Sequence, residues 1–189
     1  ALAADGLAAH AAATTILAAA AAMSAWMICD WMVHGRPTAI GSAVGAVAGL
    51  VAITPAAGFV SLQAAMLIGF VTAIVCNYAT RLVKQKLHTD DTVDVFACHG
   101  VGGTMGSILT AVFATTAINP AGADGLLYGG TQLFMANVIG SMAVVAYTMI
   151  MTFVVFKVVS MFMKVRVSET EEKSGLDVTQ HGEKAFVLR

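Results

Sequence analysis

Five long apolar stretches, separated by short breaks rich in proline, glycine or charge, are the feature that most constrains how this chain can fold. A helix needs about 20 residues to cross roughly 30 Å of hydrocarbon, because each residue adds about 1.5 Å. The composition agrees, since 58% of the residues are hydrophobic and 11% are charged, which is unlike a soluble domain. The sequence therefore predicts an all-α membrane protein with helices at about residues 6–33, 37–54, 59–86, 92–115 and 128–163.

An abrupt change in composition follows the last predicted helix. We expect residues 1–164 to form a bundle of transmembrane helices and residues 165–189 to form a polar tail. The second predicted helix is short and the last is long, so the last must tilt, bend or project from the bilayer.

The positions of lysine and arginine predict the orientation, because cytoplasmic loops carry an excess of these residues. The second and fourth connections contain neither residue. The basic residues near helix ends lie in the first connection, before the third connection and at the end of the last helix, and they are Arg36, Arg81, Lys84, Lys86, Lys157, Lys164 and Arg166. We therefore expect a multi-pass protein of the plasma or inner membrane, with its N-terminus outside and its tail in the cytoplasm.

Charge and cysteine usage exclude several classes of function. The net charge is −1 and the charges lie in short patches, so no nucleic acid partner is expected. The cysteines Cys29, Cys76 and Cys98 are far apart and form no CxxC pair, which argues against both a disulfide framework and a zinc site. We therefore expect no metal and no other cofactor.

Glycines at intervals of four residues predict close helix packing. Gly41, Gly45 and Gly49 recur in this way in the second predicted helix, and Gly102 and Gly106 do so in the fourth. Residues four apart share a helix face, and small residues there let two helix backbones approach closely inside a membrane.

Two ionisable side chains of the predicted helices have a plausible structural role. Asp94 lies in the first turn of the fourth predicted helix, three residues after Asp91, where a carboxylate accepts hydrogen bonds from free backbone N–H groups. His10 lies among alanines in the first helix, where a contact between helices is favoured over a position in a lumen.

His99 is harder to explain structurally. If the fourth helix begins near Thr92, His99 lies about 10 Å into the hydrocarbon. Ionisable residues at such a depth normally face a bundle interior or a cavity and are functional. Gly103 and Gly106 leave little bulk beside the ring, as a narrow passage requires. A functional His99 is favoured, and a hydrogen-bonded core histidine stays as the alternative.

The residues around His99 also form a familiar motif. Residues 90–103, DDTVDVFACHGVGG, closely resemble the D-D-x-x-D-V-F-x-x-H-G-V-x-G motif of the ammonium transporter (Amt/Mep) family. Residues 35–60, GRPTAIGSAVGAVAGLVAITPAAGFV, and residues 175–183, GLDVTQHGE, resemble two further signatures of the same family. The three segments occur in the family's order, so the resemblance covers essentially the whole chain.

This resemblance implies a fold of eleven transmembrane helices, in which two five-helix halves are inverted repeats and three subunits each carry a pore. The chain matches the second half, with five helices and the tail, and it looks like the C-terminal part of a longer protein. His99 matches the second of two histidines that line the pore, and Val95, one turn earlier, would narrow it. Asp94, Gly102, Gly103 and Gly106 would then be structural residues near the pore.

The implied function is transport of ammonium or ammonia, with methylammonium as an analogue, and not an enzymatic reaction. Moving a bare ammonium ion into a low dielectric has an idealised cost on the order of 20 kcal/mol, so an apolar pore excludes unassisted cations. An ion that loses its proton at the entrance becomes ammonia, for which an imidazole lone pair is a suitable partner. Potassium has no proton to lose and would be excluded.

The tail carries a regulatory prediction. Gly175 and Gly182 bracket a compact segment that also contains Asp177, Thr179 and His181. The resemblance implies that this segment packs beneath the subunits of a homotrimer, and Thr179 falls at a position that is phosphorylated in plant relatives. A phosphate there would repel nearby carboxylates and undock the segment. A nitrogen-signalling protein of the PII type is a possible partner at the cytoplasmic face.

Two other functions stay open. A redox membrane subunit would use His99, together with His10, as haem ligands. A membrane-anchored nitrogen-signalling module would act through its tail and leave His99 without a role.

Overall fold

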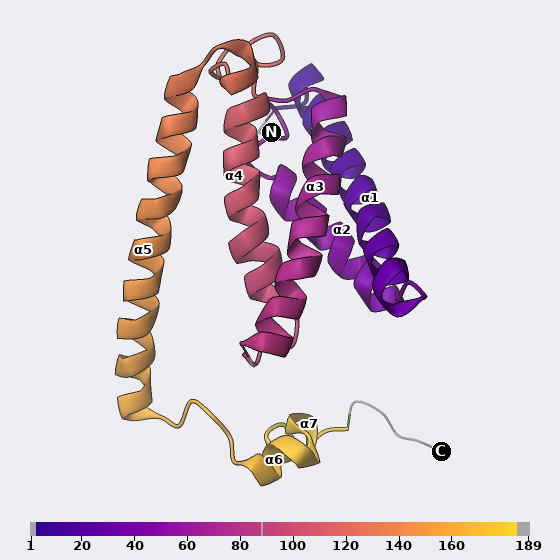
Figure 1. Cartoon of the computed structure of the whole chain (residues 1–189). Coiled ribbons are helices and arrows are strands. Elements are labelled where there is room, and N and C mark those ends of the chain that lie inside the picture. Colours follow the sequence, from indigo (N-terminus) through magenta and orange to yellow (C-terminus); the bar gives the residue numbers. More distant parts are fainter. Residues whose placement is uncertain (1–2, 88, 185–189) are drawn as a thin grey trace. The chain divides into compact units, whose positions relative to one another are not determined.

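The computed structural model describes residues 3–87 and 89–184, and this part of the chain is folded into helices joined by turns (Figure 1). Expectations for residues 185–189 of the tail lie outside the described residues. The chain forms two compact units, Ala1–Met142 and Ala143–Arg189. The boundary after Met142 lies inside the helix Thr131–Phe162, and not near residue 164, where the composition changes.

The first unit begins with helix α1 (Gly6–His34), which has a defined cap at each end. Asp5 accepts a hydrogen bond from the Ala8 N–H at 2.8 Å, and Gly35 ends the helix in the left-handed region with φ 74°. Helix α2 (Ala39–Ile53) begins at Thr38, whose hydroxyl accepts a bond from the Gly41 N–H at 2.9 Å. Both starts follow the preference for Asp and Thr as N-caps.

Helix α3 (Leu62–Arg81) is capped by Ser61 and continues into a π-helical segment, η1 (Leu82–Lys86). A second π-helical segment, η2 (Phe96–Val101), leads into α4 (Gly102–Phe113). A short 3₁₀ turn, η3 (Leu126–Tyr128), precedes α5 (Thr131–Phe162).

Four helical stretches of the described residues are long and apolar enough to cross a membrane. They are Gly6–His34, Leu62–Lys86, Phe96–Phe113 and Thr131–Phe162. Helix α2 is apolar but has 15 residues, which give a length of only about 22 Å. The all-helical fold is therefore established over the described residues, whereas a count of five spanning helices stays a prediction.

Small residues bring the helices of the first unit together. Helix α1 packs against α2 and α3, and α2 packs against α4 (Figure 1). A Cβ atom added to Gly45 would lie 2.5 Å from Trp26 Cβ, and one added to Gly49 would lie 2.7 Å from the carbonyl oxygen of Ala18. Gly69 of α3 also contacts the Ala18 backbone. Only glycine fits where backbones approach this closely.

Gly41 has a different neighbour from the other glycines of α2. A Cβ atom there would meet the carboxylate of Asp30. Asp30 is buried and accepts hydrogen bonds from Asn77 Nδ2 at 3.2 Å and from Thr38 Oγ1 at 3.3 Å. Gly41 therefore makes room for a polar junction of α1, α2 and α3, so the close packing at this position is against the side chains of Asp30 and Trp26 of α1.

Polar contacts order the connection between α4 and α5. Asp124 accepts hydrogen bonds from the Thr116 N–H at 2.7 Å and from Thr116 Oγ1 at 3.1 Å. The Thr116 amide is the main reason why the pKa of Asp124 lies below its ordinary value, and the Thr116 and Thr115 hydroxyls lower it further. The Thr115 N–H donates to the Phe59 carbonyl at 2.9 Å, which joins this loop to the turn between α2 and α3.

The lowered pKa of Asp124 predicts a pH-dependent stability. A carboxyl whose pKa falls on folding stabilises the folded chain above its unfolded pKa of about 4, and this contribution is lost as the pH falls through the folded value. We expect Asp124→Asn to lower the thermal unfolding midpoint at pH 7, and the gap from wild type to close as the pH falls below about 4. A gap of constant size down to pH 3 would assign the effect to packing and not to the charge.

Candidate functional site

The connection between α3 and α4 carries the segment that the sequence singled out. It runs from η1 to η2, so a π-helical turn lies on each side of it. π-Helical turns are rare and occur frequently at functional sites, because each inserts one extra residue into a helix. Neither turn was predicted from the sequence.

Asp91 caps the start of the helix that carries His99. Its two carboxylate oxygens accept hydrogen bonds from the Val95 N–H at 2.8 Å and from the Phe96 N–H at 2.9 Å. The prediction that Asp94 has this capping role is therefore wrong. Asp91 lies before the helix and can reach its free N–H groups, whereas Asp94 is directed elsewhere.

Asp94 forms an ion pair across the connection. Its Oδ1 lies 2.7 Å from Lys84 Nζ, and its side chain is 11% exposed, against 40% for that of Lys84. The backbone of Asp94 has φ 58°, which makes it the only non-glycine residue with a positive φ among the described residues. Aspartate is one of the few side chains that tolerate this conformation.

His99 lies in η2, about one turn after the helix begins at Val95. The helix starts later than the expected residue 92, so the rise from its start to His99 is about 6 Å and not about 10 Å. The side chain of His99 is exposed, and it has no hydrogen-bond or ion-pair partner among residues 3–87 and 89–184. The alternative of a hydrogen-bonded core histidine therefore has no support among the residues that the structure describes.

Two exposed apolar side chains lie about one turn before His99 on its helix. Val95, four residues earlier, is 50% exposed, and Phe96 is 59% exposed. An imidazole without a partner on such a face is costly to place against lipid, because nothing there satisfies its nitrogens. This face therefore suits contact with further protein or with a polar guest better than contact with hydrocarbon.

The glycines that follow His99 have two kinds of neighbour. A Cβ atom on Gly102 would lie 3.2 Å from Cys76 Sγ of α3, and one on Gly106 would contact the backbone of Ala52 of α2. These two positions hold α4 against its neighbours. Gly103 is half-buried, and a Cβ atom there would be in ordinary contact with Val51 at 3.8 Å.

His10 has a backbone partner. Its Nε2 donates a hydrogen bond to the Val60 carbonyl at 2.8 Å, which ties α1 to the turn before α3. This contact occupies the nitrogen that a haem ligand would use. The residues that the structure describes contain no group of three or more His, Cys, Asp or Glu side chains that could hold a metal ion.

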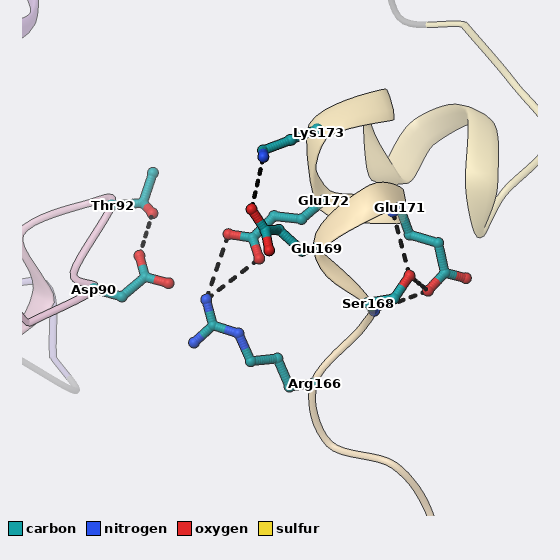
Figure 2. Close-up of polar contacts among 8 residues, drawn as sticks. All are labelled: Asp90, Thr92, Arg166, Ser168, Glu169, Glu171, Glu172 and Lys173. Atoms are coloured by element: carbon teal, nitrogen blue, oxygen red, sulfur yellow. Dashed lines mark hydrogen bonds and ion pairs between the residues drawn. The ribbon is translucent and has the colours of Figure 1, made fainter.

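The tail contains two short helices, α6 (Glu169–Ser174) and α7 (Leu176–Thr179). Figure 2 shows the capping box of α6, in which Ser168 and Glu171 form reciprocal hydrogen bonds. The same figure shows a hydrogen bond in the connection between α3 and α4, from Thr92 Oγ1 to Asp90 Oδ1 at 3.4 Å. Ser168 Oγ donates to Glu171 at 2.6 Å, and this bond is the main reason why the pKa of Glu171 lies below its ordinary value.

The tail residues from the predicted regulatory segment lie in and after α7. Thr179 Oγ1 donates to the Gly175 carbonyl at 3.0 Å, and the Glu183 N–H donates to the Asp177 carbonyl at 2.9 Å. Gly175 and Gly182 have positive φ values of 95° and 69°, which explains why glycine stands at both positions. The exposed His181 donates its N–H to the Leu176 carbonyl at 3.3 Å.

Sequence reasoning missed two further features, the partner of Lys84 in η1 and the close contact at Gly69 in α3. Lys84 was used only to predict orientation, although its spacing from Asp94 across a short loop could have suggested an ion pair. Gly69 was not singled out because it stands alone in its helix, without a second glycine four residues away.

Known proteins match this chain over almost its whole length. A family model described as Ammonium Transporter Family matches residues 1–186. The ammonium transporter of Bacillus subtilis (strain 168) is 46% identical over 186 residues, which cover 98% of this chain and 46% of that protein. The ammonium transporter of Aquifex aeolicus (strain VF5) is 44% identical over 188 residues, which cover 100% of this chain and 44% of that protein. The chain thus spans about half the length of the curated relatives it matches.

Solved structures give the same result for the fold. The crystal structure of Saccharomyces cerevisiae Mep2 is similar with a TM-score of 0.81 and 35% identity, covering 87% of this chain and 38% of that chain. A protein named Sensor Amt Protein is similar with a TM-score of 0.82 and 27% identity, covering 93% of this chain and 42% of that chain.

Proposed function

Because this chain belongs to the ammonium transporter family, we propose that it provides the His99-bearing side of a path that conducts ammonium or ammonia across a membrane. The observation that carries this proposal is the exposed imidazole of His99, which has no partner among the described residues and follows the exposed apolar side chains of Val95 and Phe96. A functional group in such a place is explained by a guest or by a second protein surface that faces it.

The chemistry follows from what a neutral imidazole offers. One ring nitrogen donates a hydrogen bond and the other accepts one, so His99 can accept a hydrogen bond from an N–H group of ammonia or pass a proton along. An apolar path excludes bare cations, because removing their water is costly. Ammonium passes as ammonia after losing its proton, whereas potassium cannot lose a charge in this way. Val95, one turn before His99, narrows the path.

The rest of the family fold completes this path. We propose that the chain acts in a homotrimer, that it corresponds to the second of two inverted repeats, and that a second histidine from the first repeat faces His99. Basic residues at the ends of α1 and α3 favour a cytoplasmic position for these ends, which places the start of α1 outside. Residues 165–189 then form a cytoplasmic tail.

Uptake of labelled methylammonium tests the proposal. The full-length transporter, meaning this chain joined to the remainder of the family fold, is expressed in cells that lack other ammonium transporters. We expect uptake that ammonium competes for and that potassium does not affect. Cells that express the protein in their membrane but take up no more label than cells with an empty vector would contradict a transport function.

The tail carries a separate prediction about Thr179. We propose that residues 175–183 regulate conduction, because α7 is a single short turn held by bonds such as that from Thr179 Oγ1 to Gly175. A negative charge at Thr179 removes this bond and adds repulsion with the neighbouring Asp177. We expect Thr179→Asp to lower methylammonium flux about several-fold, with an unchanged amount of trimer in the membrane.

A matched control is available in the same tail. Thr170→Asp adds the same charge at another exposed threonine, in α6, and we expect nearly wild-type flux. If Thr179→Asp and a chain that ends at Met163 both transport at the wild-type rate, the tail has no role in conduction. A PII-type signalling protein that binds the tail would make the flux of wild type, but not of the shortened chain, depend on that partner.

The similarity to Sensor Amt Protein favours one alternative, in which the chain serves a sensor that signals the presence of ammonium. Such a protein would bind ammonium without sustained uptake of methylammonium. The haem-binding alternative has less support, because the His10 nitrogen is hydrogen-bonded to Val60. A Soret absorption band in the purified protein would be the result expected from that alternative.

A further inference from the structure

We propose that Lys84 and Asp94 are positioning residues for His99, and that their ion pair holds the π-helical segment that carries this histidine. The inference rests on the proposed function, because it assigns the pair a task in the same conduction path. Neither residue is placed in contact with the substrate. The pair instead fixes where the helix of His99 begins.

The ion pair joins the two π-helical segments directly. Lys84 belongs to η1 and Asp94 immediately precedes the helical start of η2, so the 2.7 Å contact closes the loop between them. The carboxylate of Asp94 is almost buried while Lys84 is partly exposed. Removing one partner would leave a charge at the base of the segment without its counterion, which is unfavourable at a buried site.

The backbone at Asp94 shows that this arrangement is imposed by its surroundings. Its φ of 58° lies in the left-handed region, and a residue other than glycine adopts this backbone conformation only at an energetic cost. Such conformations persist when neighbouring contacts hold them, and they cluster at functional sites. The Asp94 carbonyl accepts the Cys98 N–H at 2.9 Å, so the strained residue is bonded to the residue next to His99.

Asp91 does not duplicate the task of Asp94. Both of its carboxylate oxygens already accept backbone N–H groups, those of Val95 and Phe96. Asp91 therefore caps the helix, whereas Asp94 anchors it to η1. The two acidic residues of the motif act on the same segment in different ways.

Loss of the anchor has a defined geometric consequence. A π-helical turn contains one extra residue, and its conversion to α-helix rotates the residues on one side of it by about 100° relative to those on the other. His99 lies in the middle of η2, so such a conversion would rotate its ring relative to α4, which follows the segment. A side chain that guides a small guest cannot tolerate such a displacement.

Three variants test the pair. Asp94→Asn removes the charge but keeps a residue that tolerates a positive φ, and Lys84→Gln removes the partner charge at a partly exposed position. Lys84→Arg keeps the charge and is the matched control. Two readouts are used, namely hydrogen–deuterium exchange of residues 92–104 in the purified full-length transporter, and the ratio of methylammonium uptake to potassium uptake in cells.

We expect Asp94→Asn and Lys84→Gln to speed amide exchange in residues 95–101 at least about tenfold and to lower the methylammonium-to-potassium ratio, whereas Lys84→Arg stays near wild type. Wild-type exchange and wild-type selectivity in Lys84→Gln would overturn the proposal, even if Asp94→Asn does not accumulate. Faster exchange with unchanged selectivity would also overturn it, because the pair would then be merely structural. A wild type that takes up no methylammonium would instead count against the proposed function, and the exchange data would still report on the anchor.

Discussion

Replacing His99 by alanine in the full-length transporter is expected to abolish methylammonium uptake or to let potassium pass. The imidazole is exposed and has no partner among the described residues, so its removal leaves the surrounding helix packing intact. His99 and ammonia are both neutral, so each hydrogen bond lost between them contributes about 0.5–1.5 kcal/mol, and the loss of one donated and one accepted bond amounts to about 1–3 kcal/mol. Flux should therefore fall by about five- to a hundredfold.

Uptake of labelled methylammonium and its inhibition by potassium measure both outcomes. His99→Gln is the informative companion, because its amide keeps a donor and an acceptor but cannot take up a proton near neutral pH. Partial flux with preserved selectivity in His99→Gln would indicate that hydrogen bonding, and not proton transfer, is the main task of His99. A wild-type rate together with wild-type selectivity in His99→Ala would remove this residue from the mechanism.

The importance of His99 could be inferred from the sequence, but its exact setting could not. An ionisable residue in an apolar segment with four nearby glycines is visible in the sequence, and so is the family motif around it. The start of its helix was misplaced because Asp94 adopts a left-handed conformation and Asp91 takes the capping role. Hydrophobic patterns average over several residues and do not report the φ angle of a single aspartate.

The apolar patterns predict the positions of the helices well. They do not predict which side chains of different helices contact one another. The N-caps Asp5, Thr38 and Ser61 act locally, so the helices start close to the predicted residues. The Asp30 junction depends on Asn77, which lies 47 positions away in the chain. Contacts of this kind require the packed arrangement and leave no regular spacing in one sequence, whereas the Lys84–Asp94 pair spans only a short loop.

Close packing at Gly45 and Gly102 leads to the second large expected effect. Gly45 is buried, and a Cβ atom there would lie 2.5 Å from Trp26 Cβ and 3.0 Å from Trp26 Cγ. The corresponding distance at Gly102 is 3.2 Å, to the sulfur of Cys76. Real Cβ contacts are essentially never as short as the first distance, so α1 and α2 would have to separate. At Gly102 a small shift of one side chain is enough.

Gly45→Leu is therefore expected to prevent folding or assembly, and Gly102→Leu to impair it less. Inserting methylene groups into a packed core costs about 1–3 kcal/mol, and a leucine pressed against another helix should reach or exceed the upper limit. The yield of folded protein in detergent and its thermal unfolding midpoint measure this effect. Gly103→Ala is the control, because a Cβ atom there would be in ordinary contact at 3.8 Å from Val51. A Gly45→Leu variant that folds and assembles normally but transports poorly would place Gly45 in the conduction path and not in a helix interface.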